Sequence, residues 1–401
     1  MLVIVGPGQG AQTPGFLQPW LEVPGFAARM EWLSACAGLD LIEHGTKSDA
    51  DTIRDTAVAQ PLIVSAGLVS LLALFPHPHD AFSQVGAGAG HSVGELTAAA
   101  ASGVISAEQA MVLVRERGRG MADAAAVTPT GMSAVLGGDP EQVIAAAEAV
   151  GLTVANHNGA GQVVVGGTHE QLAALAAAPP EGARVRPLQV AGAFHTTHMQ
   201  PAVARMSGLA RAVTTHDPRI RLLSNRDGAV VHHGTEVLER IVAQIAQPVR
   251  WDLVMRTMAD LGVTAVIEVP PAGTLTGLIK RALPGVETVA LKTPDDLPAA
   301  RELVARHGAP ADLDATPSWR LLVAPAKGTF HLAPGSDADD SLGTEIAAGT
   351  TVGAVHTLRD EHPVSAPHGG IVIEWLVEDG DPVNPGQPLL RLHPLEAEVA
   401  S

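Results

Sequence analysis

The sequence predicts an α/β protein that carries a small all-β domain near its C-terminal end. Residues 1–126 alternate strand-like apolar runs with helical patterns, which is typical of a mostly parallel sheet covered by helices. Residues 127–195 follow the order β-α-β-β-α-β, which indicates a ferredoxin-like unit inserted in the larger domain. From about residue 310, proline, glycine and short alternating strands replace the helical patterns. The chain has 401 residues, 46% of them hydrophobic and 17% charged, so it can bury a core in two or three domains.

The first region begins with an apolar strand and leads to a serine on a glycine-rich turn. Its expected elements, in chain order, are a strand at 2–6, a helix at 60–75, a strand within 81–90, a helix from 93 and a helix at 106–125. Ser106 and Glu108 suit the start of the last of these helices. The serine, Ser92, therefore lies between a strand and a helix.

The inserted unit separates two parts of the α/β core. Its expected elements are a strand at 131–138, a helix at 139–151, a hairpin at 152–167, a helix at 168–178 and a strand at 183–195. Helices and strands resume after Phe194 and continue to about residue 292, with another core strand at 263–271. We expect the following domains: an α/β core at 1–126 and 196–300, the ferredoxin-like subdomain at 127–195, a linker at 301–317 and a β domain at 318–396.

The C-terminal region contains an internal repeat. Residues 321–357 and 362–394 each run through a strand, an Ala-Pro pair, a glycine, a second strand, a turn with a G-x-x-V pattern and a final strand. Two similar β halves predict a small pseudo-symmetric sandwich.

Composition argues against several classes of protein. The net charge of −17 argues against nucleic acid as a partner, because phosphate binding needs a basic surface. No run of about 18 uninterrupted apolar residues is present, so we expect no membrane span. Cys36 is the single cysteine, which excludes an internal disulfide and suits a reducing cytoplasm. The "HPHD" at 77–80 offers at most a weak metal site, and a solvated turn is the stronger reading; we expect no metal.

Ser92 lies in the G-x-S-x-G pattern of residues 90–94. A serine hydroxyl becomes a good nucleophile only when a base takes its proton and N–H groups stabilise the oxyanion that develops. The glycines allow a sharp turn, and the N–H of Val93 and the following helix point at the reaction centre. The best candidate base is His195 in "GAFHTTHM", with His198 as a competitor that spacing alone does not exclude.

Five motifs together resemble those of malonyl-CoA:acyl-carrier-protein transacylases and of the related acyltransferase domains of polyketide synthases. They are "PGQGAQ" (7–12), "GHSVGE" (90–95), "RERGRGM" (115–121), "GAFHTTHM" (192–199) and "QIAQPVRW" (244–251). The resemblance covers residues 1 to about 295 and implies an α/β-hydrolase-like acyltransferase core. It departs from the family at "EVPP" (268–271), where Glu-Val-Gly-Pro is usual, and at Gln247, where asparagine is common.

The resemblance implies a role for each matched position at the catalytic centre. Ser92 would form an acyl ester, and His195 would act first as general base and then as general acid. The backbone carbonyl of Gln244 would orient the histidine, and the N–H groups of Gln9 and Val93 would form the oxyanion hole.

The resemblance also implies a substrate site. Arg117 would bind the free carboxylate of a malonyl group, because a planar guanidinium matches a carboxylate in bidentate fashion. Phe194 would wall the pocket, as in members selective for malonyl. His91 and Met121 would lie at the same site, and so would Asn158, for which a plain hairpin turn is an equal alternative.

The implied reaction is a ping-pong exchange with two thiols. Malonyl-CoA acylates the serine, CoA leaves, and the phosphopantetheine thiol of an acyl carrier protein attacks the ester. No covalently bound cofactor is needed. A carrier protein is acidic, as is this chain, so docking would need a local basic patch, for which Lys280 and Arg281 are candidates.

The C-terminal region resembles a biotinyl/lipoyl carrier domain. In that family a lysine at a hairpin tip carries the cofactor, but alignment places Arg359 at the lysine position, with Leu358 before it. An arginine cannot form the amide, because its guanidinium stays protonated. Lys327 lies outside the tip, so we expect an unmodified module that docks a partner or is merely structural.

Two other functions stay open on the sequence alone. The chain could be an acyltransferase or acyl-thioester hydrolase with another acyl specificity. It could also be an inactive scaffold with an acyltransferase fold, although Ser92, His195 and Arg117 are all present.

Overall fold

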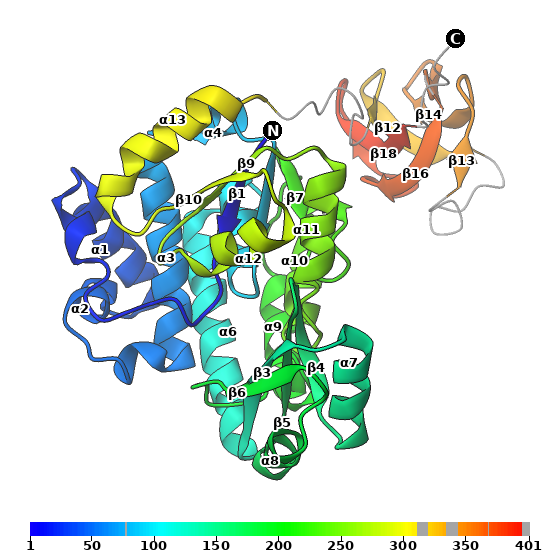
Figure 1. The fold of residues 1–401 in the computed structure, drawn as a ribbon. Coiled ribbons are helices and arrows are strands. Elements are labelled where there is room, and N and C mark those ends of the chain that lie inside the picture. Colours follow the sequence, from blue (N-terminus) through cyan, green and yellow to red (C-terminus); the bar gives the residue numbers. More distant parts are fainter. Residues whose placement is uncertain (77, 311–319, 334–343, 368, 395–401) are drawn as a thin grey trace. The chain divides into compact units, whose positions relative to one another are not determined.

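The computed structural model describes residues 1–76, 78–310, 320–333, 344–367 and 369–394 (Figure 1). The chain divides into two units, Met1–Ala311 and Asp312–Ser401, and each has its own hydrophobic core.

A six-stranded sheet forms the centre of the first unit, in the order β10-β9-β1-β2-β7-β8 (Figure 1). Its strands are β1 (Leu2–Gly6), β2 (Ala87–Gly90), β7 (Arg221–Leu223), β8 (Val230–Val231), β9 (Ala265–Glu268) and β10 (Glu287–Ala290). All neighbours pair in parallel except β7 and β8, which are antiparallel. Leu2 and Ile4 belong to one buried cluster, whereas Val3 and Val5 belong to another. Successive strand side chains point to opposite faces, so both faces of the sheet are covered, as the predicted α/β class requires.

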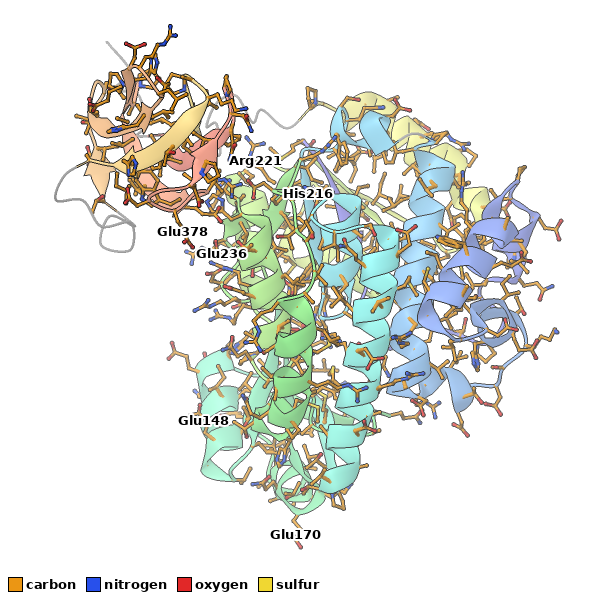
Figure 2. All side chains as sticks on the ribbon, turned by 180° about the vertical axis from the view of Figure 1, so that it is seen from behind. Glu148, Glu170, His216, Arg221, Glu236 and Glu378 are labelled. Atoms are coloured by element: carbon orange, nitrogen blue, oxygen red, sulfur yellow. The ribbon has the colours of Figure 1, made fainter. Side chains whose placement is uncertain are left out.

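Helices pack against both faces of this sheet. Outside the inserted subdomain, the helices of the first unit are α1 (Phe26–Ala37), α2 (Leu41–Thr46), α3 (Thr56–Leu74), α4 (Pro78–Phe82), α5 (Gly94–Ala101), α6 (Ala107–Val127), α9 (Gln200–Ala210), α10 (Gly234–Gln244), α11 (Trp251–Asp260), α12 (Thr274–Ala282) and α13 (Leu297–His307). Side chains of α3, α5 and α6 share the cluster of Ile4, while those of α11 and α12 share the cluster of Val5. Glu148 and Glu170 are exposed, and Figure 2 shows both projecting away from the fold.

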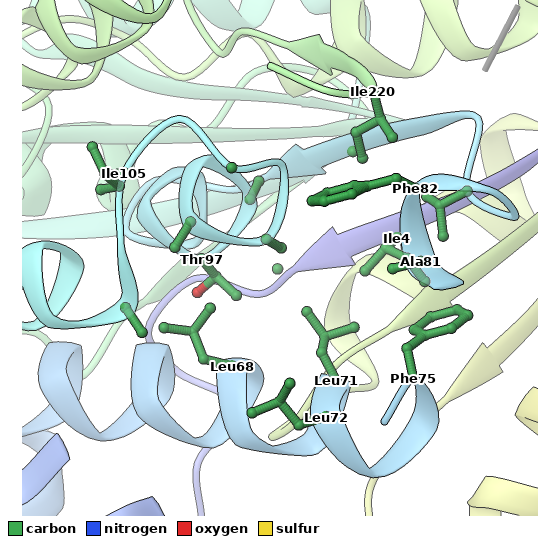
Figure 3. A pocket seen from close by; sticks show the side chains of 18 of the residues that line it. Ile4, Leu68, Leu71, Leu72, Phe75, Ala81, Phe82, Thr97, Ile105 and Ile220 are labelled. Carbon is green, nitrogen blue, oxygen red and sulfur yellow. The ribbon is translucent and has the colours of Figure 1, made fainter. Parts of the chain in front are cut away.

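An apolar cavity of about 360 Å³ lies between α3, α4, α5 and the sheet (Figure 3). Leu68, Phe75, Phe82 and Ile220 are among its lining residues. Ser92, His195 and Arg117 do not line it, so this cavity is separate from the serine turn.

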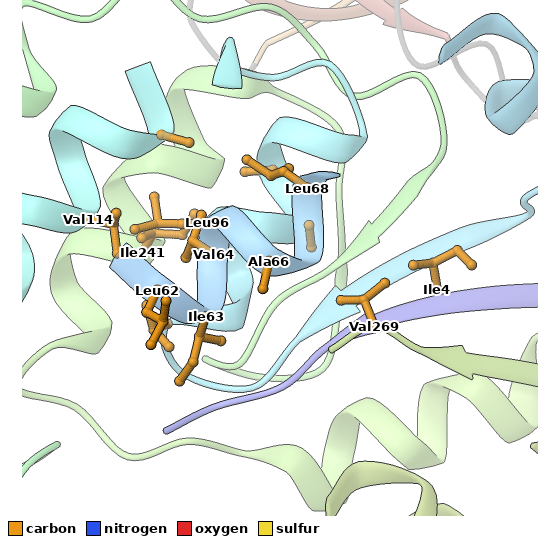
Figure 4. Close-up of a cluster of buried hydrophobic side chains, with 14 of the residues drawn as sticks. Ile4, Leu62, Ile63, Val64, Ala66, Leu68, Leu96, Val114, Ile241 and Val269 are labelled. Atoms are coloured by element: carbon orange, nitrogen blue, oxygen red, sulfur yellow. The ribbon is translucent and has the colours of Figure 1, made fainter. Parts of the chain in front are cut away.

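Helix α3 lies at the centre of the larger core (Figure 4). Among the described residues it is the one helix long and apolar enough to cross a membrane, with a mean hydropathy of 2.0 in its most apolar window. In this fold 72% of that window is buried. Leu62, Ile63 and Val64 are fully buried on successive positions, so α3 is apolar on all sides because protein surrounds it.

Helix α6 begins where the sequence predicts, with Ser106 as its N-cap. The reciprocal partner in the capping box is Gln109 rather than Glu108. Glu108 instead accepts a hydrogen bond from the indole of Trp32 at 3.0 Å.

The inserted subdomain has the predicted ferredoxin-like order. Its elements are β3 (Thr130–Gly137), α7 (Pro140–Ala149), β4 (Thr153–Gly159), β5 (Gln162–Thr168), α8 (His169–Ala177) and β6 (Ala183–Pro187). The strands pair in the antiparallel order β4-β5-β3-β6. One face of this sheet packs on α7 and α8, while Met132, Ala134 and Val164 on the other face join the core of the larger sheet.

Two predicted boundaries are wrong. The strand expected at 183–195 ends at Pro187, because the chain then leaves the sheet and Gly192 packs closely against Ala125 of α6. The linker expected from residue 301 overlaps α13, whose Leu297, Ala300 and Leu303 are buried against the core. Helical spacing of these apolar residues keeps the chain in the first unit through this segment.

The second unit contains two four-stranded sheets, in the orders β11-β18-β16-β13 and β15-β14-β12-β17. The strands are β11 (Arg320–Val323), β12 (Gly328–Leu332), β13 (Glu345–Ile346), β14 (Thr351–His356), β15 (Glu361–Ser365), β16 (Gly370–Trp375), β17 (Pro382–Val383) and β18 (Pro388–Pro394). The first half of the unit contains β11 to β14 and the second half β15 to β18. When each strand is exchanged for its counterpart in the other half (β11 with β15, β12 with β16, β13 with β17 and β14 with β18), one sheet order becomes the other. The predicted repeat is therefore a pseudo-twofold arrangement, in which each half supplies two strands to each sheet.

Matching hydrogen bonds link the two halves. The N–H of Gly349 donates to Ala366 O at 2.7 Å, and the N–H of Gly386 donates to Ala324 O at 2.8 Å. Both alanines are buried, which explains why an Ala-Pro pair recurs in each half.

Strands β1 and β2 meet helix α5 at a contact between backbones. A Cβ at Gly90 would lie 1.9 Å from Gly94 C, and a Cβ at Gly94 would lie 2.1 Å from Gly6 O. Neither obstacle is the movable end of a side chain, so these positions require glycine.

Replacing Gly90 or Gly94 with alanine should therefore lower the free energy of unfolding by about 3 kcal/mol, measured by urea denaturation. Gly208→Ala is the matched control: it lies within α9 with no atom within 4 Å of its Cβ position. It should raise stability by up to about 1 kcal/mol. Equal effects at all three positions would contradict the packing described here.

Candidate active site

Ser92 lies on the turn between β2 and α5 in a conformation that few non-glycine residues adopt. Its φ is +54°, and the φ of His195 is +61°. Such backbone costs of order 1–3 kcal/mol per residue and persists only where the surroundings enforce it. The hydrogen bond from His91 N to Gly6 O, at 2.9 Å, ties the turn to the end of β1.

The side chains of Ser92 and His195 meet, although 103 residues separate them in sequence. Ser92 Oγ lies 2.9 Å from His195 Nε2. On the other side of the ring, Nδ1 lies 2.9 Å from Gln244 O and 3.0 Å from Gln244 Nε2. Nδ1 cannot donate a hydrogen bond to Gln244 O and accept one from Gln244 Nε2 at the same time. In one tautomer, Nδ1–H donates to the Gln244 carbonyl, and Nε2 is then free to accept the serine proton. The side-chain oxygen of Gln244, Oε1, accepts instead from the Arg117 guanidinium at 3.4 Å.

His195 is 4% exposed, and burial lowers its pKa to about 3. The nearby Arg117 guanidinium lowers the pKa further, against the opposing effect of the Gln244 carbonyl. The ring is consequently neutral, and able to accept a proton, throughout the pH range from 5 to 8.

His198, the competing candidate base, lies in a short 3₁₀ helix (Thr197–Met199). Its N–H donates to Thr196 Oγ1 at 3.3 Å. The histidine that reaches Ser92 is His195, a choice that sequence spacing left open.

Arg117 projects from α6 into the interior beside the serine and is 1% exposed. Its Nη1 donates to Gln60 Oε1 at 2.6 Å. Its Nη2 lies 3.2 Å from Ser92 Oγ and 3.4 Å from Gln244 Oε1. Nε is buried and has no hydrogen-bond partner in the part of the chain that the structure describes.

No carboxylate among the described residues forms an ion pair with Arg117. Burial lowers its pKa to about 10, with Glu95 acting in the opposite direction, so the guanidinium stays charged at neutral pH. The neighbouring arginines differ: Arg115 and Arg119 both pair with Glu116, at 2.8 and 3.5 Å. A buried cation with only neutral partners is costly, and it is suited to receive an anionic ligand.

Gln60 is a residue of this site that the motifs did not reveal. It lies on α3, is 2% exposed, and its amide nitrogen is 3.4 Å from the sulfur of Met121. The sequence signal was an amide side chain in an otherwise apolar helical run. Gln60 binds Nη1 of Arg117, whereas Ser92 lies at Nη2.

His91, next to the serine, contacts the inserted subdomain. Its Nε2 lies 2.9 Å from Asn158 Oδ1, and Asn158 Nδ2 donates to Gln162 Oε1 at 3.1 Å. Its ring centroid is 5.7 Å from that of Trp251. Asn158, on strand β4, therefore contacts His91 next to the serine, and it also belongs to the β4–β5 hairpin.

The remaining predicted site residues lie near the same turn. Val93 is the N-cap residue of α5, so its N–H belongs to the first turn, where N–H groups have no acceptor within the helix. Gly8 approaches His91 so closely that a Cβ would lie 3.0 Å from its ring, which places the loop of Gln9 beside the serine turn. Gln9 Nε2 donates to Arg54 O. Phe194 is buried directly before His195.

Among the described residues, no group of three or more histidine, cysteine or acidic side chains is arranged to hold a metal ion. His77 of the "HPHD" stretch lies outside the described residues.

Comparison with known proteins gives a consistent picture for the first unit. A family described as "Acyl transferase domain" matches residues 3–295. The malonyl CoA-acyl carrier protein transacylase of Mycobacterium tuberculosis is 48% identical over 302 residues, which cover 74% of this chain and 98% of that protein. The transacylase of the same name from Escherichia coli (strain K12) is 32% identical over 306 residues, with coverages of 75% and 98%.

Solved structures agree. The crystal structure of "MCAT" from Mycobacterium tuberculosis has a TM-score of 0.72 at 48% identity and covers 75% of this chain and 99% of that chain. A complex described as a type II PKS acyl-carrier protein with its malonyl-transacylase has a TM-score of 0.69 at 27% identity, with coverages of 75% and 99%.

The neutral His195 predicts how Ser92 reacts with a fluorophosphonate, which forms a phosphorus–oxygen bond to an activated serine and releases fluoride. Because the pKa of His195 is depressed, its deprotonated form persists as the pH falls. The labelling rate should stay level from pH 8 to pH 5, whereas an ordinary histidine would lose about tenfold or more below pH 6.

His195→Ala should slow this labelling by at least about 100-fold, and His198→Ala, as the matched control, should leave it unchanged. Intact-mass spectrometry over time measures both rates. A rate that falls with a midpoint near pH 6.5 would show that the histidine is not held neutral.

Proposed function

This chain belongs to the acyl transferase family, and on that premise we propose that it transfers a malonyl group from malonyl-CoA to the phosphopantetheine thiol of an acyl carrier protein, in fatty acid or polyketide biosynthesis. The observation that carries the proposal is Arg117, a charged and buried guanidinium 3.2 Å from the Ser92 hydroxyl, with no carboxylate partner among the described residues.

The first half-reaction forms an ester on Ser92. His195 Nε2 takes the hydroxyl proton as Oγ attacks the thioester carbonyl, and Gln244 O stabilises the imidazolium through Nδ1–H. The N–H groups of Gln9 and Val93 receive the oxyanion. The tetrahedral intermediate collapses, the carbon–sulfur bond breaks, and His195 returns the proton to the departing CoA thiolate.

The second half-reaction reverses these roles with a different thiol. His195 takes the proton of the phosphopantetheine thiol, and the thiolate attacks the ester carbonyl. When the carbon–oxygen bond breaks, the proton passes to Ser92 Oγ and regenerates the free enzyme. Neither half needs a metal ion or an organic cofactor.

Selectivity for malonyl follows from the charge of Arg117. The free carboxylate of a malonyl ester would pair with the guanidinium, which Gln60 holds in place at 2.6 Å. An acetyl group would leave the buried cation without that partner, and sites of this kind reject analogues that lack the matching group. Phe194 would restrict the pocket to an unbranched acyl unit, while His91, Met121 and Asn158 complete the surroundings.

The carrier protein would dock through local positive charge. Carrier proteins are acidic and this chain has a net charge of −17, so overall charge opposes association. Lys280 and Arg281 are exposed in the last turn of α12 and are the residues we assign to the docking patch. The reaction and the single cysteine both suit the cytoplasm.

The second unit is proposed to act as an unmodified carrier-like module. Arg359 lies in the turn between β14 and β15, where Thr357 N donates to Asp360 O, and the adjacent Leu358 is fully exposed. This hairpin is the place where a biotinyl/lipoyl domain carries its modified lysine. A docking role would keep a partner at high local concentration beside the transferase.

Incubating the protein with malonyl-CoA should add one malonyl group to Ser92, and adding a holo carrier protein should remove it. Intact mass and peptide mapping follow both steps, with Ser92→Ala as the unlabelled control. Release of free malonate without a carrier would favour a hydrolase instead. An unlabelled protein would indicate an inactive scaffold.

Arg117→Ala should lower kcat/KM for malonyl-CoA by about 100- to 1,000-fold while changing that for acetyl-CoA by less than about tenfold. The physical reason is that the variant loses the charge that only the malonyl carboxylate needs. An equal loss for both substrates would show that Arg117 supports the fold or the serine and does not select the acyl group.

Co-expression with a biotin ligase and a lipoate ligase should leave the mass of the second unit unchanged, because neither enzyme can acylate Arg359. Arg359→Lys in the same cells supplies the comparison. Modification of the natural protein at Lys327 would contradict the proposal for this module.

A further inference from the structure

We propose that Asn225 is a positioning residue for the nucleophile: its side-chain amide bridges the two sides of the Ser92 turn, and Glu95 fixes Asn225 in place. This inference rests on the proposed role of Ser92 as the acylated serine and adds to it the group that holds the serine in its strained conformation.

The amide of Asn225 contacts the backbone on both sides of His91. Asn225 Oδ1 accepts from Ser92 N at 2.7 Å, and Asn225 Nδ2 donates to Gly90 O at 2.6 Å. One partner is a donor and the other an acceptor, so only a side chain that presents both functions can satisfy the pair. Asn225 is completely buried, and it follows strand β7, far from the turn in sequence.

Asn225 is held in turn through its own backbone. Its N–H donates to Glu95 Oε1 at 2.8 Å, and its carbonyl accepts from Arg250 N at 2.8 Å. Glu95 is the second residue of α5 and is 5% exposed, and its Oε2 has no partner within the described ranges. The strand β7, the serine turn and the helix that follows it are thereby linked by three short hydrogen bonds.

Burial raises the pKa of Glu95 to about 8, against the opposing effects of the Asn225 N–H and the Arg117 guanidinium. The acid is therefore largely neutral at pH 7. A neutral carboxyl still accepts from the Asn225 N–H, and it leaves the charge of Arg117 available to a ligand. The hydrogen bond from the Asn225 N–H needs an acceptor oxygen on Glu95, and it does not need a negative charge there.

This link explains how a φ of +54° persists at Ser92. With its N–H bonded to Asn225, Ser92 cannot rotate to an ordinary conformation without losing a buried hydrogen bond. The direction of Oγ toward His195 depends on that φ. Displacing a reacting group by about 1 Å can cost about 100-fold in rate, so the amide would act on catalysis without touching the substrate.

The test uses fluorophosphonate labelling of Ser92 in the full-length chain. Asn225→Asp preserves size, but its ionised form has no donor for Gly90 O, whereas its protonated form has one. At pH 8 this variant should label Ser92 about 10- to 100-fold more slowly than the natural protein. The deficit should shrink as the pH falls to 5, where the buried acid regains its proton.

The natural protein and the Asn225→Asp variant have the same charged residues around Asn225. The ratio of their labelling rates therefore reports on the change at Asn225. These charged residues are Glu95 of α5, Arg117 of α6, Asp227 after β7, Arg240 of α10 and Arg250 before α11. His195 stays neutral across this pH range in the natural protein.

Two variants at Glu95 separate positioning from stability. Glu95→Gln keeps an acceptor for the Asn225 N–H and should label Ser92 within about threefold of the natural rate. Glu95→Met has similar length and no such acceptor, so it should slow labelling by about tenfold or more, even where its thermal midpoint is unchanged or higher.

Labelling rates of the Asn225 and Glu95 variants that only follow their thermal midpoints would overturn the inference. The malonyl-CoA assay keeps the two proposals distinct. If the natural protein reacts with the fluorophosphonate but not with malonyl-CoA, the proposed function fails while the role of Asn225 is still tested by the labelling rates.

Discussion

The buried charge of Arg117 is the constraint on which the rest of this site depends. Removing a guanidinium from water costs several kcal/mol, and Gln60, Gln244 and Ser92 return only part of that through neutral hydrogen bonds. The same charge helps to keep His195 neutral and therefore basic. Burial is the main cause of the neutral base, and the charge of Arg117 adds to it. The same cation also creates the demand for a carboxylate, so one residue acts on both the base and acyl selectivity.

The backbone of the site is strained at two residues. Ser92 and His195, which supply the two reacting atoms, both have positive φ. Tight contacts among Gly6, Gly90 and Gly94, together with the side chain of Asn225, leave the serine turn little freedom to relax. Strain of this kind is typical of sites whose geometry is fixed before the substrate binds.

The sequence predicted more of the architecture than of the contacts. Alternating apolar runs and the β-α-β-β-α-β order predicted both sheets of the first unit, because hydrophobic periodicity is a local property. The choice between His195 and His198, and the parts played by Gln60 and Asn225, depend on contacts between segments 57 to 135 residues apart, which no local pattern encodes. The sequence places residues 301–307 of α13 in a linker, because charged residues obscure the buried face of this part of the helix.

A crystal structure of the malonyl ester on Ser92, with Gln60 and Gln244 intact, would show directly whether the carboxylate pairs with Arg117. We expect the free carboxylate to lie within hydrogen-bonding distance of Arg117 Nη1 and Nη2, in a paired arrangement. A carboxylate that points to solvent, with the guanidinium still bound only to its neutral partners, would contradict this expectation.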